Sequence, residues 1–347
     1  MLKASYKKYT LNLTEERGTS RGWLQSKDSW FIKVWDESNV EIIGIGECSF
    51  LPNLNPENLD TYEDKIAEVC KRINDSEYWL SEGLSKFPSI HFGLEVALLD
   101  LEKNGSKILF DSPFTLSQNP TPINGLIWMG TFENMMQQVD EKIAAGYRCI
   151  KLKIGAIDFE KELHILKSIR EKSQNIEIRV DANGAFSTAE ALEKLHQLAE
   201  YNLHSIEQPI KQGLPATMNQ LCKESPLPIA LDEELIGKFT REAKAETLDA
   251  IDPPYIILKP SLIGGIKGSR EWIDLAEERG INWWITSALE SNIGLNAISQ
   301  FVATTGNTMF QGLGTGKLYT NNIGSPLSIA GDELFYKQDL KWDLSGL

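Results

Sequence analysis

Six charged residues stand at the ends of short apolar runs in this 347-residue chain, and they follow one another at a regular spacing. They are Lys151, Lys153, Asp181, Glu207, Asp232 and Lys259. The steps from 151 to 259 each take about 25–30 residues, which is the length of one strand–helix unit in a barrel. Because the carboxyl ends of successive parallel strands line one mouth of a barrel, we expect all six side chains to converge there.

The types of these residues point to a definite chemistry. Asp181, Glu207 and Asp232 form an all-oxygen set that suits Mg²⁺, which Mn²⁺ could replace. A chelated carboxylate substrate has an acidified α-proton, and a desolvated lysine near other cations has a lowered pKa and can remove that proton. Lys151 and Lys153 share one face of a strand, since side chains alternate with a period of two. The set therefore predicts proton abstraction next to a carboxylate.

Taken alone, each part of this set has a plain structural explanation. A Lys-x-Lys pair is typical of a solvated strand edge, Asp181 before Ala-Asn-Gly of a turn, and Asp232 of a helix N-terminus. Lys259, which precedes a proline, could simply end a strand. The joint arrangement favours function, because one such group in each of five consecutive units is hard to explain as edges and turns. Lys259 also arrives four units after the lysine pair, from the opposite side of the mouth.

The second part of the chain alternates apolar runs with helix-period segments. The expected strands are 123–129, 149–154, 176–180, 205–206, 228–231, 255–258, 282–286 and a weak one at 309–310. The expected helices are 132–145, 158–172, 188–201, 216–223, 241–250, 265–279 and 293–304. Eight such units predict a closed (β/α)₈ barrel, and a doubly wound open sheet is the alternative.

The pattern of the first part of the chain predicts a separate α+β domain over residues 1–115. Strands are expected at 3–13, 30–35 and 40–48, and helices at 59–73 and 91–104. The polar stretch 14–27, which contains Gly18 and Gly22, is long enough to predict a mobile loop. Turn formers in 110–122 mark a boundary, the barrel domain takes 120–324, and the tail 325–347 is expected to return to the first domain.

Composition narrows the classes of function. The formal charge of −14 argues against binding to nucleic acid or to an anionic membrane surface, since both attract basic proteins. Cys48, Cys70, Cys149 and Cys222 form no CxxC pair, which favours reduced thiols in a cytoplasm. The N-terminus does not resemble a signal peptide, and no apolar run is long enough to span a bilayer. The four histidines share no ligand spacing, which disfavours zinc.

The same residues carry a family resemblance. The chain resembles the muconate-lactonizing subgroup of the enolase superfamily in these motifs: Lys151-Leu-Lys153, Val180-Asp181-Ala-Asn-Gly184, Ile206-Glu207-Gln-Pro209, Leu231-Asp232-Glu233 and Leu258-Lys259-Pro260. Gly44-Ile-Gly46-Glu47, followed by Pro52, resembles the N-terminal signature of that superfamily. The resemblance covers nearly the whole chain and rests on six motifs in the right order.

This resemblance implies an α/β fold, in which an α+β capping domain covers a modified TIM barrel of the (β/α)₇β type. It implies that Asp181, Glu207 and Asp232 hold Mg²⁺. It implies that Lys153 and Lys259 are the acid/base lysines on opposite faces of the substrate, and that Lys151 supports them.

Three further stretches resemble the subgroup members that form o-succinylbenzoate in menaquinone biosynthesis. They are Arg179, Ser287-Ala-Leu-Glu290-Ser-Asn-Ile-Gly294 and Gln311-Gly-Leu-Gly314-Thr315. The resemblance implies a lyase that removes water from 2-succinyl-6-hydroxy-2,4-cyclohexadiene-1-carboxylate by syn-elimination. Lys153 would take the α-proton and return it to the departing hydroxyl, while Lys259 would stabilise the enediolate from the other face.

The resemblance also suggests which residues hold the small dicarboxylate substrate. Ser287 and the backbone of Gly312 would hold its succinyl end, and the stretch 17–27 would close over it. The full set of expected substrate contacts is Arg179, Asn183, Ser287, Gly312, Arg17 and Arg21.

Other functions stay open on the sequence alone. A racemase or epimerase of the same subgroup, acting on N-succinylamino acids or dipeptides, needs the same two lysines. Dipeptide epimerases carry Asp-x-Asp where this chain has Gly314-Thr315-Gly316, which argues against a cationic substrate end. A third hypothesis is a non-catalytic binding protein with the same fold. The presence of all three predicted metal ligands and of the lysines disfavours it. The oligomeric state, including a homo-oligomer, is open.

Overall fold

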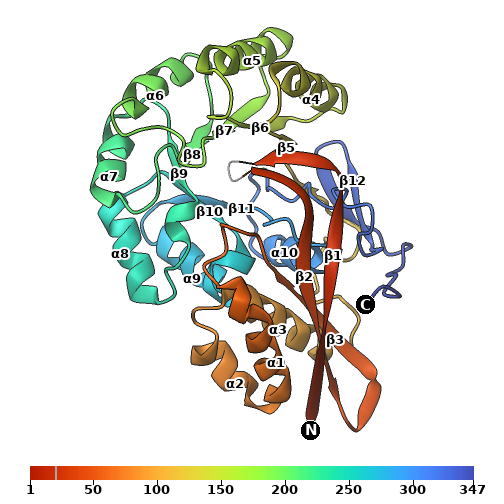
Figure 1. Cartoon of the computed structure of the whole chain (residues 1–347). Helices are drawn as coiled ribbons and strands as arrows, with labels where there is room; N and C mark the ends of the chain where they lie inside the picture. The colour runs from red at the N-terminus through yellow and green to blue at the C-terminus, as the bar shows by residue number, and fades with distance from the viewer. Residues whose placement is uncertain (20–21) are drawn as a thin grey trace.

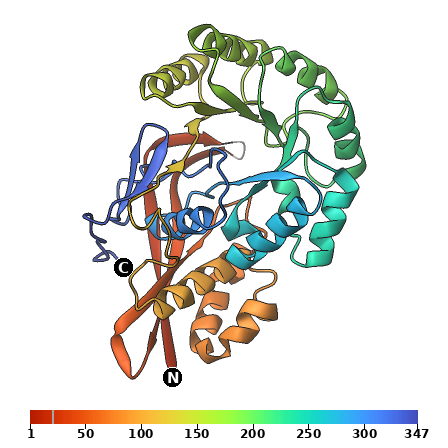
Figure 2. The same cartoon turned by 180° about the vertical axis from the view of Figure 1, so that it is seen from behind.

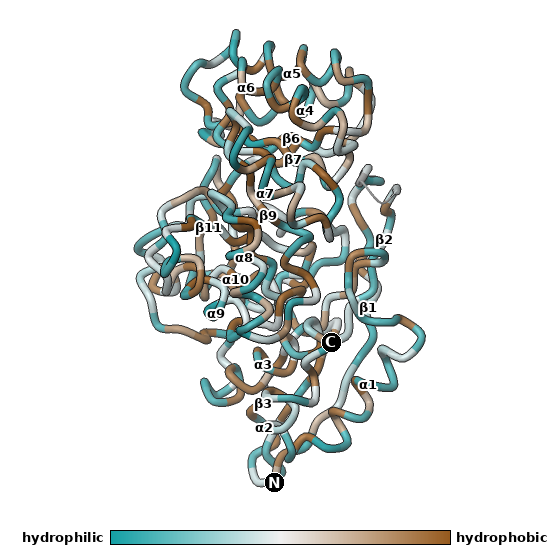
Figure 3. The backbone as a smooth tube through the Cα atoms, turned by 90° about the vertical axis from the view of Figure 1, so that its left-hand side faces the viewer, coloured by the Kyte–Doolittle hydropathy of each residue, from teal (hydrophilic) through white to brown (hydrophobic). Residues whose placement is uncertain are grey.

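The computed structural model describes residues 1–19 and 22–347 of the chain. Two bodies of secondary structure are visible in Figure 1: a barrel surrounded by helices, and an N-terminal α+β unit that covers one end of it. Figure 3 shows the molecule from the side, with α4 to α6 at one end and α1 to α3 at the other. In the described residues, no helix is both long and apolar enough to cross a membrane.

Seven parallel strands form the barrel wall, in the order β11-β10-β9-β8-β7-β6-β5. Their bounds are β5 (Gly125–Ile127), β6 (Cys149–Lys153), β7 (Glu177–Asp181), β8 (Ser205–Glu207), β9 (Ile229–Leu231), β10 (Tyr255–Leu258) and β11 (Asn282–Ile285). The order follows the chain without a reversal, so the structure contradicts a doubly wound open sheet. The apolar side chains of these strands are buried, because helices cover the sheet from outside.

One helix follows each of these seven strands and packs outside the barrel (Figure 1). The helices are α4 (Phe132–Ala144), α5 (Phe159–Lys172), α6 (Ala191–Ala199), α7 (Pro215–Glu224), α8 (Arg241–Ile251), α9 (Gly265–Glu277) and α10 (Asn292–Ala303). Short 3₁₀ turns, η3 (Glu233–Leu235) and η4 (Pro260–Leu262), precede α8 and α9. The expected alternation of strands and helices is therefore confirmed.

The eighth position of the barrel is held by two residues rather than by a full strand. Gly312 pairs in parallel with Thr286 at the end of β11, and Gln311 pairs in parallel with Ile123 just before β5. These two bridges close the barrel between its first and last strands. The prediction of a strand at 309–310 was wrong by two residues, and within the described chain no helix follows this position. The fold is thus a (β/α)₇β barrel.

The N-terminal unit is an antiparallel sheet of β1 (Leu2–Thr19), β2 (Gly22–Asp36) and β3 (Asn39–Ser49), packed against helices. The helical segments are α1 (Leu59–Lys71), η1 (Ile73–Asp75), α2 (Ser76–Tyr78), η2 (Trp79–Gly83) and α3 (Pro88–Glu102). The expected mobile loop at 14–27 was wrong, because the described residues of that stretch continue β1 and β2 as a ribbon. An irregular register between Asn12 and Arg17 interrupts the ribbon.

The tip of this ribbon reaches the mouth of the barrel. Gly18 pairs with Met129 just after β5, and Leu13 pairs with Tyr319 after the eighth position. The Thr14 amide also donates to the Leu318 carbonyl at 2.8 Å. Figure 1 shows β1 and β2 running from the N-terminal end of the molecule up to β5. The ribbon is therefore a cover for the end of the barrel where the strands terminate.

Two glycines of β3 allow α3 to lie directly on the sheet. A Cβ atom at Gly46 would lie 1.9 Å from the Gly93 carbonyl oxygen, and one at Gly44 would lie 2.0 Å from that of Ala97. Both contacts are to helix backbone, so neither neighbour can give way by rotating a side chain. This packing explains the Gly44-Ile-Gly46 motif in physical terms.

We expect Gly46→Ala to lower the free energy of unfolding by about 3 kcal/mol, because the added methyl group forces β3 and α3 apart. Urea denaturation of both proteins measures this difference. Gly346→Ala is the control, since a Cβ there would meet nothing closer than 3.5 Å. Equal stability of the Gly46 and Gly346 variants would contradict the packing argument.

The C-terminal segment divides its contacts between the two bodies. The strands β12 (Leu327–Ala330) and β13 (Glu333–Tyr336) form a sheet with β4 (Thr121–Pro122), in the linker before the barrel. The last residues, with Trp342, Leu344 and Leu347, pack against Phe31 and Ile45 of the N-terminal sheet. Figure 2 shows this hairpin and the C-terminus beside β1 and β2. The domain limits 1–115 with 325–347, and 120–324, stay our proposal.

Candidate active site

The ends of neighbouring strands bring Lys153, Asp181 and Glu207 to one level of the barrel. In the parallel register Lys153 is the partner of Asp181, and Asp181 is the partner of Glu207. Asp232 follows β9 and Lys259 follows β10, next along the wall. Because β7, β8 and β9 separate β6 from β10, Lys153 and Lys259 face each other across the mouth.

Ion pairs tie the lysines to the acids. The Lys151 ammonium lies between two carboxylates, 3.0 Å from Asp181 Oδ2 and in contact with Glu207 Oε2. The Lys153 ammonium lies 2.9 Å from Asp181 Oδ2 and donates to Asn183 Oδ1 at 2.7 Å. On the other side, the Lys259 ammonium contacts Asp232 Oδ2.

These ion pairs determine the direction in which the pKa values of the buried groups shift. Burial alone would lower the pKa of Lys151 and of Lys259, but the carboxylates beside them outweigh it and raise both values. Burial would raise the pKa of Asp181, but the charges of the lysines lower it overall. The expectation of a lysine with a lowered pKa is therefore wrong for Lys151 and Lys259 as they stand, since each has an acid at ion-pair distance.

The three carboxylates fit a divalent cation by their chemistry. Asp181, Glu207 and Asp232 are each at most 2% exposed, and Glu207 Oε1 is buried without a hydrogen-bond partner. Burial and the charge of Asp181 raise the pKa of Glu207 well above its usual range. In the chain as described, no three acidic side chains point their oxygens at one spot, because lysine ammonium groups are bonded to those oxygens. A cation could replace those contacts.

A tight turn after β7 points the Asn183 side chain toward Lys153. Asn183 has φ +43° and Gly184 has φ +74°, a left-handed pair that asparagine and glycine tolerate best. The Asn183 amide nitrogen donates to Glu233 Oε1 at 3.0 Å while its oxygen accepts from Lys153. The Asp-Ala-Asn-Gly motif therefore positions the partner of Lys153, and the sequence did not indicate the link to Glu233.

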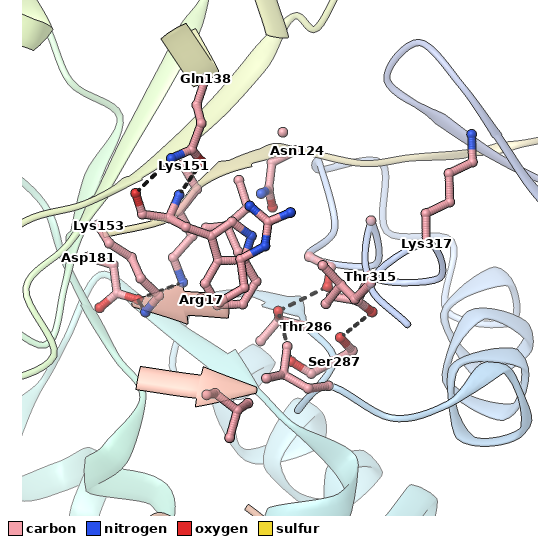
Figure 4. A pocket seen from close by; sticks show the side chains of 18 of the residues that line it. Arg17, Asn124, Gln138, Lys151, Lys153, Asp181, Thr286, Ser287, Thr315 and Lys317 are labelled. Atoms are coloured by element: carbon pink, nitrogen blue, oxygen red, sulfur yellow. Dashed lines mark hydrogen bonds and ion pairs between the residues drawn. The ribbon is translucent and has the colours of Figure 1, made fainter. Parts of the chain in front are cut away.

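A cavity of about 770 Å³ opens above these groups. Its wall includes Lys151, Lys153, Asp181, Asn183 and Lys259. The ribbon closes it from above with Glu15, Arg17, Gly22, Trp23 and Leu24. In the view of Figure 4, Lys153 and Asp181 lie on one side, Thr286, Ser287 and Thr315 lie on the other, and Arg17 lies between them.

Most of the expected substrate contacts line this cavity. Ser287 and Gly312 do so, and Ser287 Oγ lies 2.8 Å from Thr315 Oγ1, in hydrogen-bond contact. Gly312 must be glycine, because a Cβ there would lie 2.1 Å from Thr286 Oγ1. Arg17 also lines the cavity, whereas Arg21 lies outside the described residues.

Arg179 does not line the cavity, so the structure does not support it as a substrate contact. Its guanidinium donates to Glu177 Oε1 at 2.7 Å and to the Phe310 carbonyl at 2.8 Å, and it lies 4.2 Å from the Trp284 ring centre. Arg179 points inward like Asp181 but is two residues earlier on β7, so it lies about 6–7 Å deeper in the barrel. It fills the interior below the site.

A buried polar cluster joins the N-terminal sheet to the loop that carries Ser287. Glu47 accepts from the amides of Ser291 and Gly294 at 2.9 and 3.0 Å, at the start of α10. Lys27 on β2 donates to Ser49 Oγ at 2.6 Å and lies 3.8 Å from Glu47 Oε1. The sequence reasoning used Glu47 only as part of a motif and missed Lys27. Through these bonds the ribbon and the cavity wall are held as one piece.

Glu162 holds the loop that follows Lys153. Its Oε1 accepts from the amides of Gly155, Ala156 and Ile157, the first at 2.7 Å. Removal from water raises the pKa of Glu162 to about 7, and the amide donors offset this only in part. Because the folded chain holds this proton more tightly, its contribution to stability is complete below about pH 4.5 and is lost as the pH rises through about 7.

We therefore expect the free energy of unfolding to fall by up to about 3 kcal/mol between pH 4.5 and pH 7.5 on account of this carboxyl. Glu162→Gln removes that part of the slope, which urea denaturation across the pH range measures. Glu171→Gln, an exposed acid on the same helix, should keep the wild-type slope. A slope that is the same in all three proteins would contradict the assignment.

Comparison with known proteins agrees with this architecture. A family model described as "Enolase C-terminal domain-like" matches residues 134–334, more than half of the chain. An o-succinylbenzoate synthase from Desulfotalea psychrophila is 47% identical, over 95% of this chain and 98% of that protein. The chain belongs to the o-succinylbenzoate synthase family of the enolase superfamily. The family resemblance is thereby confirmed, and the enzyme is a hydro-lyase.

Solved structures place this synthase-family enzyme in the same fold. The crystal structure of MenC from Desulfotalea psychrophila superposes with a TM-score of 0.81 at 42% identity, covering 96% of this chain and 99% of that one. A dipeptide epimerase from Enterococcus faecalis, crystallised with Mg and L-Leu-L-Tyr, superposes with a TM-score of 0.83. At 20% identity over 97% of each chain, the epimerase supports the fold alone.

Proposed function

We propose that this enzyme dehydrates 2-succinyl-6-hydroxy-2,4-cyclohexadiene-1-carboxylate to o-succinylbenzoate, as a step in menaquinone biosynthesis. The observation that carries the proposal is the pair Lys153 and Lys259, which face each other across a cavity above three buried carboxylates. The 47% identity to an o-succinylbenzoate synthase supports the substrate. The product is aromatic, which makes the loss of water favourable.

Lys153 is the proposed acid and base. As a free amine it takes the α-proton next to the ring carboxylate, and the electron pair of that C–H bond enters the ring. The resulting ammonium gives the proton to the hydroxyl as its C–O bond breaks. One water leaves, and Lys153 returns to the amine. Asn183, whose oxygen accepts from the Lys153 ammonium at 2.7 Å, keeps the group aimed at that face.

Lys259 acts from the opposite face without transferring a proton. Its raised pKa keeps it charged, so its ammonium stabilises the negative charge that forms in the ring. Lys151 stays charged for the same reason and supports the carboxylate end of the substrate.

Asp181, Glu207 and Asp232 are the residues that would hold Mg²⁺. A divalent cation at these carboxylates would supply positive charge beside the substrate carboxylate, which acidifies the α-proton. Ser287 and the backbone of Gly312 are the proposed hydrogen-bonding partners of the succinyl end. The ribbon with Arg17 excludes water from above. Since all four cysteines are unpaired, we place the reaction in the cytoplasm.

Racemisation of N-succinylamino acids is the second candidate, because a lysine on each face is also what a racemase needs. The experiment compares kcat/KM of the purified enzyme for the dehydration with kcat/KM for the racemisation of an N-succinylamino acid. We expect dehydration to be faster by a factor of about ten or more, on the basis of the family match. A higher kcat/KM for racemisation would overturn the proposal.

A further inference from the structure

Three cations on the wall of the cavity stand apart from the carboxylates of the reaction centre, and two of them have no acidic partner among the described residues. They are Arg17 on the ribbon, Lys142 on α4 and Lys317 after the eighth barrel position. Among the described residues, Lys142 and Lys317 form no ion pair and no hydrogen bond through their ammonium groups. Arg17 has one ion pair, to Glu15 at 2.5 Å, whose side chain is 62% exposed, and its Nε is buried without a partner.

Arg17, Lys142 and Lys317 line the same cavity, and the charges of Arg17 and Lys317 act unfavourably on the Lys142 ammonium. The pKa of Lys142 is lowered first by burial and then by the charges of Arg17 and Lys317, which the single acid Glu141 does not outweigh. Folding has therefore gathered like charges at a cost, and an anion between them would remove that cost. Counted over the whole wall, six lysine and arginine side chains face three acids, namely Glu15, Glu141 and Asp181.

Aromatic rings hold two of these cations in place. Arg17 lies 5.8 Å from the ring centre of Trp128, and the Lys142 ammonium lies 4.9 Å from that of Tyr147. Both rings line the cavity, so a ligand there meets apolar faces beside the charges. In the view of Figure 4, Arg17 lies between Lys151 and Thr315, and Lys317 lies on the far side of Thr315.

We propose that Arg17, Lys142 and Lys317 form a second anion subsite, which binds the carboxylate of the substrate that takes no part in the reaction. This inference rests on the proposed function, since that substrate carries one carboxylate on the ring and one at the end of its succinyl chain. The lysines above the metal ligands take the first, and the outer cluster takes the second. Ser287 and Gly312 offer hydrogen bonds to the chain between them, while the cluster supplies charge.

The subsite makes the cavity selective for dicarboxylates. A ligand that lacks the terminal charge leaves Lys142 and Lys317 uncompensated, so it binds more weakly. Lys142 and Lys317, which form no ion pair among the described residues, are the side chains to substitute. The affinity for a dicarboxylate should depend on their charge more than on their shape.

The test uses the double variant Lys142→Gln/Lys317→Gln, with Lys142→Arg as the charge-conserving variant and Lys161→Gln, an exposed lysine outside the cavity, as control. Calorimetry gives Kd for o-succinylbenzoate and for its analogue with a terminal carboxamide. We expect Kd for the dicarboxylate to rise about tenfold or more in the double variant, while Kd for the carboxamide changes less than twofold. Lys142→Arg and the control should bind both ligands like the wild type.

In turnover the loss should fall on KM rather than on kcat, because neither substituted lysine takes or returns the proton in the proposed reaction. An equal loss of affinity for both ligands, or unchanged Kd for the dicarboxylate, would overturn the subsite. Binding and turnover separate the two proposals. If the wild type binds o-succinylbenzoate with this charge dependence but does not dehydrate the diene, the proposed function fails and the subsite stands.

Discussion

Lys153→Ala should reduce kcat for the dehydration by about 10³-fold or more, because it removes the group that both takes and returns the proton. The fold should persist. Asp181, the partner of Lys153, keeps its second ion pair with Lys151 at 3.0 Å, so the substitution leaves no buried carboxylate unpaired. Absorbance of the diene, followed over time under saturating substrate, measures the effect.

Lys259→Ala should be similarly damaging, and Lys161→Ala, on the outer helix α5, should turn over like the wild type. Circular dichroism and the melting temperature show whether each variant is folded. A Lys153→Ala protein that is folded and retains more than a tenth of the wild-type kcat would remove Lys153 from the mechanism.

Removing divalent cations should abolish turnover, and adding Mg²⁺ should restore it. The reason is the charge of the centre: three carboxylates, one of them with an oxygen that has no partner, are buried together at the base of the cavity. Binding of a cation to the folded chain alone should also raise its stability by about 2.7 kcal/mol at a hundredfold excess over Kd. Turnover in EDTA and melting curves with and without Mg²⁺ measure the two effects.

Glu207→Gln is the variant that tests whether the Mg²⁺ response comes from these carboxylates, since glutamine keeps the shape of the side chain but cannot become a carboxylate ligand. We expect it to lose both the Mg²⁺-dependent rise in melting temperature and the activity. Glu171→Gln, an exposed acid on α5, should keep both. Full activity of the wild type in EDTA, with no melting shift on adding Mg²⁺, would refute the metal site.

The convergence of these side chains at the mouth of the barrel was predictable because two simple regularities determine it. The period of two along a strand places Lys151 and Lys153 on one face, and the length of the strand–helix unit brings Asp181 and Glu207 to the same level. Both regularities depend on backbone geometry that is the same in every barrel of this kind. The roles of these residues are implied by the family resemblance and stay a prediction.

The predictions that were wrong concerned the depth of a side chain in the barrel and contacts between segments that are distant in the sequence. Arg179 is on the inward face of β7, but it lies two residues before Asp181 and so below the cavity. The alternation of side chains along a strand predicts the face and not the depth. Most described residues of the stretch 14–27 are exposed or line the cavity, which leaves no apolar alternation that could predict a strand. Lys142 and Lys317 carried no signal at all, since a lone lysine on a helix or loop looks like surface.

The most direct test of the proposed dehydration is to mix the purified protein with 2-succinyl-6-hydroxy-2,4-cyclohexadiene-1-carboxylate and Mg²⁺ and to quantify the product over time by chromatography. We expect complete conversion to o-succinylbenzoate, with one water lost per molecule, and conversion at least about 10³-fold slower with the folded Lys153→Ala variant. Conversion at the same rate by both proteins, or by neither, would contradict the proposal.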